Sequence, residues 1–504
     1  MEDVKYSQSK LEGFIQNPKK AIWKMTIPFL LGLSVQSIYM LMDTMFVGKF
    51  LTREGMSAEQ INHLSQCALD AMGAIFPLMF IIMGLTFGLG SGVTTLIAQH
   101  LGAKNKKIAD SVASHTVIIG LALPIIITTI VLLLGDFIMS LELRDAAPET
   151  VKYAKEYFNI MAFGSVFMIL AIFCRSILSG EGETILPMKI LGFGTILNII
   201  LDPIFIIVFK MEVAGAAIAT VISNGTVALT FMYLLIFKNK SYTTISFKKN
   251  VFKFDVKIIK NLFRLGIPAS LSFAVMSIGM FAHNSILSYA DQNPNAIEIF
   301  SKESSNSKSD ATTPEIRQGG VIGGYQTALR VENLFMNLVI ALSSSMVTIV
   351  GMFYGAKRID LIRPVINYAL KWSLIFSAIA MFIFFTFSES ILSIFTDDYK
   401  TIKEGVNFFN ICAFTCPFVA IGMLTCRAMQ GMNKPTPFLF LTLLRVILIA
   451  LPMAWIGVKY FNYNVQWVWW SILVSSILTA ILSLFWMYRI IDQYESDNVK
   501  VTTS

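Results

Sequence analysis

The chain has 504 residues, of which 55% are hydrophobic and only 14% are charged. A soluble globular domain carries about 25% charged residues, so this composition excludes an ordinary soluble protein and indicates a polytopic membrane protein. The net charge of +8 is better explained by basic loops that orient the chain in a lipid bilayer than by a nucleic-acid partner.

Twelve apolar segments are long enough to cross a hydrocarbon core of about 30 Å as helices. A polar tail of residues 1–23 precedes them, and a second tail of residues 491–504 follows them. The first apolar segment is too long for a cleavable signal peptide and is expected to stay in the membrane. The predicted spans are 24–48, 71–99, 110–139, 155–179, 186–209, 213–237, 265–289, 321–353, 364–387, 405–428, 438–460 and 466–490.

Basic residues gather in the loops on one side of these twelve spans, which predicts that this side faces the cytoplasm. Both termini are then cytoplasmic, and the protein is expected to be a multi-pass protein of the plasma membrane. The connection 238–264 carries eight basic residues against the single acid Asp255. It is interpreted as a basic cytoplasmic linker, with contact to anionic lipid as the alternative.

The two halves of the chain repeat each other. Residues 27–43 (IPFLLGLSVQSIYMLMD) align without gaps with residues 267–283 (IPASLSFAVMSIGMFAH), and LGAKN at 101–105 corresponds to YGAKR at 354–358. Ordered matches of this kind predict an all-α membrane protein with twelve transmembrane helices in two pseudo-symmetric six-helix lobes. The lobes would be residues 24–237 and 265–490. A polar outer-loop insertion at 291–319 has no assigned role.

Polar residues that occur in only one half are candidates for function, because a requirement of the duplicated fold should appear in both. Asp43 aligns with His283. Asn198 and Asp202 lie four residues apart and therefore on one helix face, whereas the corresponding stretch 446–452 (VILIALP) is apolar. A carboxylate at the centre of a membrane helix costs about 2.5–3.5 kcal/mol. A functional role for the aspartates is therefore favoured over a structural one.

Thr220, in a helix whose second-half counterpart is apolar at that position, completes the candidate set. Counted from the charges Lys49, Lys210 and Glu212 at about 1.5 Å per residue, three of these side chains lie at one depth, about 9–12 Å below the outer surface. Carboxylate, amide and hydroxyl oxygens suit a hard cation such as Na⁺. Alternatively, burial and mutual repulsion would let the carboxylate pair carry a proton.

Several motifs, taken together and in order, resemble the multidrug and toxic compound extrusion (MATE) family. They are an Ile-Pro opening helix that ends in DTMFVG, the GAK turn after the second helix, CRSILSGEG after the fourth, and NIILDP in the fifth. The resemblance covers residues 20–490. It implies efflux of organic, often cationic or aromatic, compounds by alternating access, in exchange for Na⁺ or H⁺. It also implies a first-lobe cation site at Asp43, Asn198, Asp202 and Thr220, whereas the second-lobe acids of some members are missing here.

Other residues are candidates for a cavity, a hinge or helix packing. Met40, His283 and Arg445 are candidate cavity residues, with pairing to Glu332 as the alternative for Arg445. Pro28 is interpreted first as a proline in the first turn of a helix, and as a candidate hinge in the alternative. The glycines of GLTFGLGSG (Gly84, Gly88 and Gly92) have the spacing of close helix packing. Cys412 and Cys416 share a helix face, but with too few ligands nearby for a metal site.

The leading hypothesis is therefore a secondary antiporter that exports organic molecules, with a flippase for lipid-linked precursors as the alternative. Twelve helices and few cavity arginines argue against the flippase. An enzyme is not expected, because the chain has no HExxH motif and no nucleophile elbow. No cofactor is expected besides the coupling ion, Na⁺ or H⁺. The expected partners are a small organic substrate and the lipid bilayer, and the protein is expected to act as a monomer.

Overall fold

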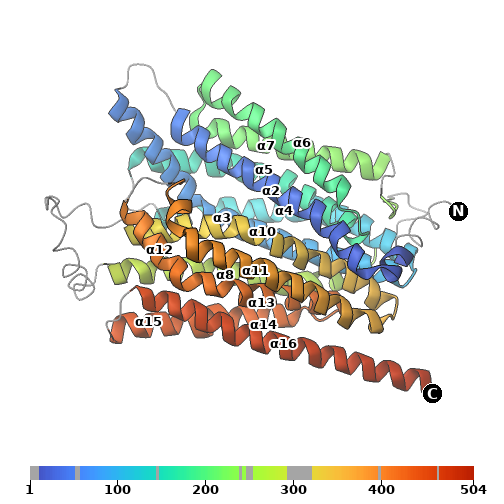
Figure 1. Ribbon diagram of the computed structural model, residues 1–504. Helices are drawn as coiled ribbons and strands as arrows, with labels where there is room; N and C mark the ends of the chain where they lie inside the picture. The colour runs from blue at the N-terminus through green and yellow to red at the C-terminus, as the bar shows by residue number, and fades with distance from the viewer. Residues whose placement is uncertain are drawn as a thin grey trace. The chain divides into compact units, whose positions relative to one another are not determined.

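The computed structural model describes residues 11–50, 57–142, 147–237, 241–245, 254–291, 320–395, 399–461 and 465–503. Long helices make up most of this part, as Figure 1 shows. Twelve helices or helix series in this part are long and apolar enough to cross a membrane, and none of these residues lies in a β-strand. The predicted all-α architecture with twelve transmembrane helices is confirmed. In a bilayer, an α-helix satisfies every backbone polar group within the segment itself.

The first half of the chain contributes the following elements: α2 (Pro18–Phe50), α3 (Ala58–Gly102), α4 (Lys106–Glu142), α5 (Pro148–Gly180), α6 (Ile185–Pro203) with its continuation η1 (Ile204–Val208), and α7 (Glu212–Met232) with η2 (Tyr233–Phe237). The continuations η1 and η2 are π-helices, wider than an α-helix and often found at functional sites.

The second half contributes α8 (Val256–Asp291), α10 (Gly320–Gly355), η4 (Ile359–Leu361), α11 (Ile362–Leu392), α12 (Tyr399–Cys412), η5 (Ala413–Thr415), α13 (Cys416–Gly431), α14 (Thr436–Leu443), η6 (Leu444–Ala450), α15 (Leu451–Tyr460) and α16 (Gln466–Thr503). The insertion, predicted at 291–319, lies outside the described residues from position 292 onward.

The chain forms two compact units. Unit 1 contains residues 1–273 and 347–358, and unit 2 contains residues 274–346 and 359–504. The predicted lobes, 24–237 and 265–490, follow the two copies of the sequence repeat, and this division stays a prediction. The compact units instead divide the chain within the helices α8 and α10. Unit 1 therefore includes the first part of α8 and the last part of α10.

Pro28 does not lie in the first turn of a helix, so the preferred interpretation of this residue is wrong. The helix α2 begins at Pro18, ten residues earlier, because the polar stretch before the apolar segment is also helical. Pro268, the repeat partner of Pro28, is likewise internal to α8. A proline inside a helix removes one backbone hydrogen bond and favours a kink, so the candidate hinge is the interpretation that remains.

The glycines of α3 allow the first part of α8 to approach closely, as their spacing predicts. A Cβ atom on Gly92 would lie 2.8 Å from the carbonyl oxygen of Leu262 and 2.9 Å from the backbone nitrogen of Gly266. One turn further along, Ser270 faces Gly88, and its Oγ donates a hydrogen bond of 2.7 Å to the carbonyl oxygen of Leu85. Only glycine leaves room for backbones this close.

A second close approach joins the ends of α3 and α10 within unit 1, at the two GAK turns. A Cβ atom on Gly102 would lie 2.9 Å from the Cα atom of Met352, and a Cβ atom on Gly355 would lie 2.9 Å from the Cα atom of Gln99. Gln99 and Met352 each precede their own glycine by three residues. The contact is therefore reciprocal, as expected for two copies of one motif.

Candidate cation site

Asn198 and Asp202 lie on the same face of α6, as their spacing predicts. Both side chains are buried, with exposed fractions of 2% and 0%. The Nδ2 atom of Asn198 donates a hydrogen bond of 3.3 Å to the Oδ1 atom of Asp202. A buried carboxylate is costly unless it is paired or hydrogen-bonded, and the neighbouring amide supplies part of that compensation.

Thr220 lies on α7, which packs along α6. The register of the two helices follows from two glycines. A Cβ atom on Gly194 would lie near Ser223, and a Cβ atom on Gly215 would lie 2.9 Å from the carbonyl carbon of Phe205. The segment of α7 between these contacts faces the segment of α6 that holds the polar pair. Thr220 belongs to this segment and is buried, with 5% of its surface exposed.

The polar pair is followed at once by a proline and a π-helix. Pro203 has no N–H group, so the carbonyl of Ile199 loses its usual partner in the helix. The π-helix η1 begins at the next residue, Ile204. Irregular backbone within a membrane helix is typical of sites that bind ions or substrates, because it leaves carbonyl oxygens available to a ligand.

Ser223 is a further polar residue here that the sequence reasoning missed. It lies three residues after Thr220, hence on the same face of α7, and is buried. The three-residue spacing of Thr220 and Ser223 is visible in the sequence and could have identified Ser223 as a candidate. The Oγ atom of Ser223 and the Oδ1 atom of Asn198 have no hydrogen-bond partner among the described residues. Both oxygens are free to accept a hydrogen bond or to coordinate a hard cation.

Asp43 and Met40 have described backbones within α2, but their side chains lie outside the described part of the structure. The helix α2 packs along α6 and also contacts η1 and α7. Its backbone therefore borders the element that carries Asn198 and Asp202. The participation of the Asp43 carboxylate remains a prediction.

The two remaining cavity candidates lie in unit 2. His283 is buried, its Nδ1 atom lies 2.7 Å from the carbonyl oxygen of Gly279, and its Nε2 atom has no partner among the described residues. Arg445 lies in the π-helix η6 and interacts electrostatically with Glu332 on α10. Their assignment to a cavity remains a prediction.

Within the described part of the chain, no three His, Cys, Asp or Glu side chains are grouped so that they could hold a metal ion. The five cysteines are buried and free. Cys416 lies 4.0 Å from a carboxylate oxygen of Glu332. Among the described side chains, the candidate oxygen ligands at α6 and α7 are amide and hydroxyl groups together with the carboxylate of Asp202.

Twelve apolar helices, a duplicated six-helix plan and a buried polar pair within a membrane helix define this chain as a polytopic membrane transporter. The sequence matches the MatE family over residues 56–204 and 320–456, and the chain belongs to this family. The family predicted from the motifs is thereby confirmed.

Related proteins match over nearly the full length of the chain. The "Probable multidrug resistance protein NorM" of Thermotoga maritima is 25% identical over 92% of this chain and 91% of its own. The "Multidrug export protein MepA" of Staphylococcus aureus is 24% identical over 95% of both. A solved structure of a MOP superfamily transporter from Pyrococcus furiosus has a TM-score of 0.83 and 27% identity, covering 95% of this chain and 97% of that one.

Proposed function

We propose that this protein is a secondary active antiporter that exports organic compounds, often cationic or aromatic, in exchange for Na⁺ or H⁺. The coupling ion binds in the first half of the chain, at Asn198, Asp202 and Thr220, with Asp43 as a further ligand. The protein lies in the plasma membrane. The side with the basic loops faces the cytoplasm, and both termini lie on that side.

One observation carries the proposal: a buried amide–carboxylate pair occurs in α6, and the corresponding stretch 446–452 has only apolar residues and proline. Related proteins of matching length are described as multidrug resistance and export proteins, which supports organic molecules as the exported class. A pair needed only for folding should recur in the second copy, because that copy builds the same helix series.

The mechanism follows from competition between the coupling ion and the substrate. An ion bound by Asp202 and its neighbours favours one arrangement of α6 and the helices that border it. The substrate favours another arrangement, so each ligand weakens the binding of the other. This coupling needs a difference of about 1–3 kcal/mol in affinity between the two states.

The test is substrate efflux from membrane vesicles in which Na⁺ and pH gradients are imposed separately. Wild-type protein should export under one of the two gradients, and the variant Asp202→Asn should lose this dependence while still inserting into the membrane. The matched control is Asp360→Asn, which makes the same change at an exposed position of the basic side. Full gradient-driven export by Asp202→Asn would contradict the proposed site, and movement of lipid-linked precursors alone would favour the flippase.

A further inference from the structure

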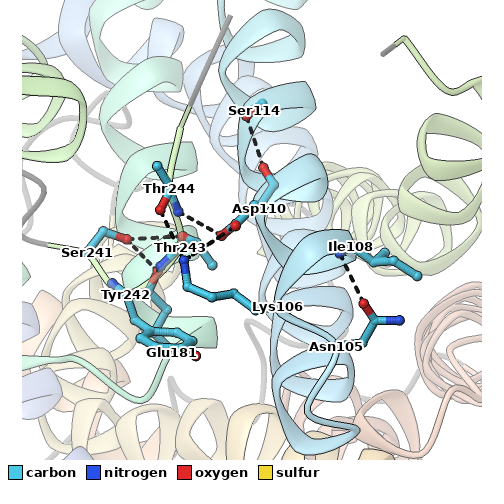
Figure 2. Close-up of polar contacts among 10 residues, drawn as sticks. All are labelled: Asn105, Lys106, Ile108, Asp110, Ser114, Glu181, Ser241, Tyr242, Thr243 and Thr244. Atoms are coloured by element: carbon cyan, nitrogen blue, oxygen red, sulfur yellow. Dashed lines mark hydrogen bonds and ion pairs between the residues drawn. The ribbon is translucent and has the colours of Figure 1, made fainter. Parts of the chain in front are cut away.

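A short segment of the connection between the two halves is held tightly against unit 1. Residues 241–245 follow α7 and η2, and Figure 2 shows 241–244 near Glu181, at the end of α5. One carboxylate oxygen of Glu181 accepts hydrogen bonds from the Thr243 N–H at 2.9 Å, the Thr243 Oγ1 at 2.5 Å and the Ser241 Oγ. The other accepts one from the Tyr242 N–H at 2.9 Å.

A second carboxylate, on α4, holds the next residue of the segment. Asp110 accepts a hydrogen bond of 2.8 Å from the Thr244 N–H. One turn earlier, the Nζ atom of Lys106 lies 3.4 Å from Asp110, donates to the Thr244 Oγ1 at 3.1 Å and lies 5.0 Å from the centre of the Tyr242 ring. Figure 2 shows both carboxylates directed toward the same short segment.

The far end of the connection is also attached to α4. The Nε2 atom of His115 accepts a hydrogen bond of 2.9 Å from the Asp255 N–H, just before α8 begins. The His115 ring is buried and lies 5.5 Å from the Phe254 ring. Its Nδ1 atom lies 2.7 Å from the carbonyl oxygen of Ser111, a donor position that leaves Nε2 as the acceptor. The connection is therefore held at both ends.

The end of α10 packs against the turn that carries Glu181. The Oγ1 atom of Thr348 donates a hydrogen bond of 2.9 Å to the carbonyl oxygen of Ser179. Gly182 has φ +74, and a Cβ atom there would lie 2.9 Å from the Phe14 ring and 3.5 Å from the Met352 Cε. Displacing this turn would therefore disturb both the connection and the last part of α10.

The carboxylate of Glu181 is not required by the turn itself. In the second half, Asn433 has φ +66 and occupies the left-handed position that Gly182 occupies in the first. The residue before Asn433 is Met432, which is fully buried, whereas the residue before Gly182 is Glu181. An apolar side chain thus completes the same turn in the second half.

Burial raises the pKa of the Glu181 carboxyl above its ordinary value, while the four hydrogen bonds that it accepts act in the opposite direction. These bonds provide the compensation that a desolvated carboxylate requires. Loss of the bonds would therefore be costly for Glu181 as well as for the segment that it holds.

We propose that Glu181, with Asp110, forms a clip that fastens the connection between the two halves to the basic side of unit 1 and keeps the end of α10 packed there. The clip restrains the start of α8 and the end of α10 as long as these segments stay packed in unit 1. Its release is a step in opening the transport path toward the basic side. Its role in the transport cycle rests on the proposed function, whereas its effect on local structure does not.

Hydrogen–deuterium exchange of the full-length protein in nanodiscs tests the clip directly, because the amides of Tyr242, Thr243 and Thr244 donate to the two carboxylates. Both oxygens of Glu181 accept N–H bonds, so no orientation of a glutamine amide preserves them all. In Glu181→Gln, the amides of 242 and 243 should exchange about tenfold faster or more, and the amides of 347–355 should also lose protection.

Glu183→Gln is the matched control, because it makes the same change two residues further along the turn, where Glu183 accepts hydrogen bonds from the N–H groups of Ile185 and Leu186 at the start of α6. Its exchange at 241–244 should equal that of wild type. If Glu181→Gln folds poorly, the double variant Ser241→Ala, Thr243→Val removes two donors and leaves the carboxylate in place. It should accelerate exchange at 241–244 in the same way.

Unchanged exchange at 241–244 in both clip variants, or an equal effect of Glu183→Gln, would overturn the clip. Unchanged exchange at 347–355 would overturn its effect on α10. Efflux measurements separate this failure from failure of the proposed function. A clip variant should change the export rate and keep its dependence on the ion gradient, whereas Asp202→Asn should lose that dependence and keep the exchange at 241–244.

Discussion

The reciprocal contact of Gly102 and Gly355 predicts that a larger side chain at either position lowers the melting temperature, and this direction depends only on local packing. In Gly102→Ala, the new Cβ atom would lie 2.8 Å from the carbonyl carbon and 2.9 Å from the Cα atom of Met352. Both atoms belong to the backbone, so the ends of α3 and α10 must move apart. Forced overpacking of this kind costs about 1–3 kcal/mol, and the melting temperature of the purified protein should fall.

Gly192 and Gly422 are the matched controls, because among the described residues no atom from outside their own stretch of helix backbone lies within 4 Å of a Cβ atom placed on either of them. Alanine favours a helix over glycine by about 1 kcal/mol, so these two variants should melt at or above the wild-type temperature. The double variant Gly102→Ala, Gly355→Ala should lose less stability than the sum of the single changes, since the first separation of the helices relieves the second.

Thermal unfolding monitored by intrinsic fluorescence compares all these variants under one condition. A wild-type melting temperature for Gly102→Ala would contradict the predicted clash with Met352, as would an equally large fall in the melting temperatures of the two control variants. Strict additivity in the double variant would show that the two glycines do not share one contact.

Three further substitutions test the candidate site and the turns. Thr220→Val removes a buried hydroxyl at nearly constant volume, so we expect weaker ion dependence of efflux at near-normal expression; unchanged ion dependence would exclude Thr220 as a ligand. Ser223→Ala should reduce the apparent ion affinity in the same assay, and an unaltered affinity would assign Ser223 to packing alone. Lys104→Gly should raise the melting temperature, because Lys104 is exposed and has a φ of 57. This left-handed conformation costs a residue with a side chain about 1–2 kcal/mol, and a lower melting temperature would contradict the proposed backbone strain at Lys104.

The sequence by itself determined the membrane class, the twelve helices and the duplicated plan. These features depend on local hydrophobicity and on repeated motifs, which are read directly along the chain. It also placed Asn198 and Asp202 on one helix face, because residues four apart in an α-helix always share a face. The structure confirms that both are buried and hydrogen-bonded to each other.

Only the tertiary structure decided the contacts between segments that are distant in the sequence. The bonds between Glu181 and residues 241–243 join positions 60 to 62 residues apart. The approach of Gly102 to Met352 depends on how α3 and α10 align, which no local pattern records. Pro28 lies inside a helix because the polar stretch before it is helical too, a choice that weak local preferences leave open and packing settles.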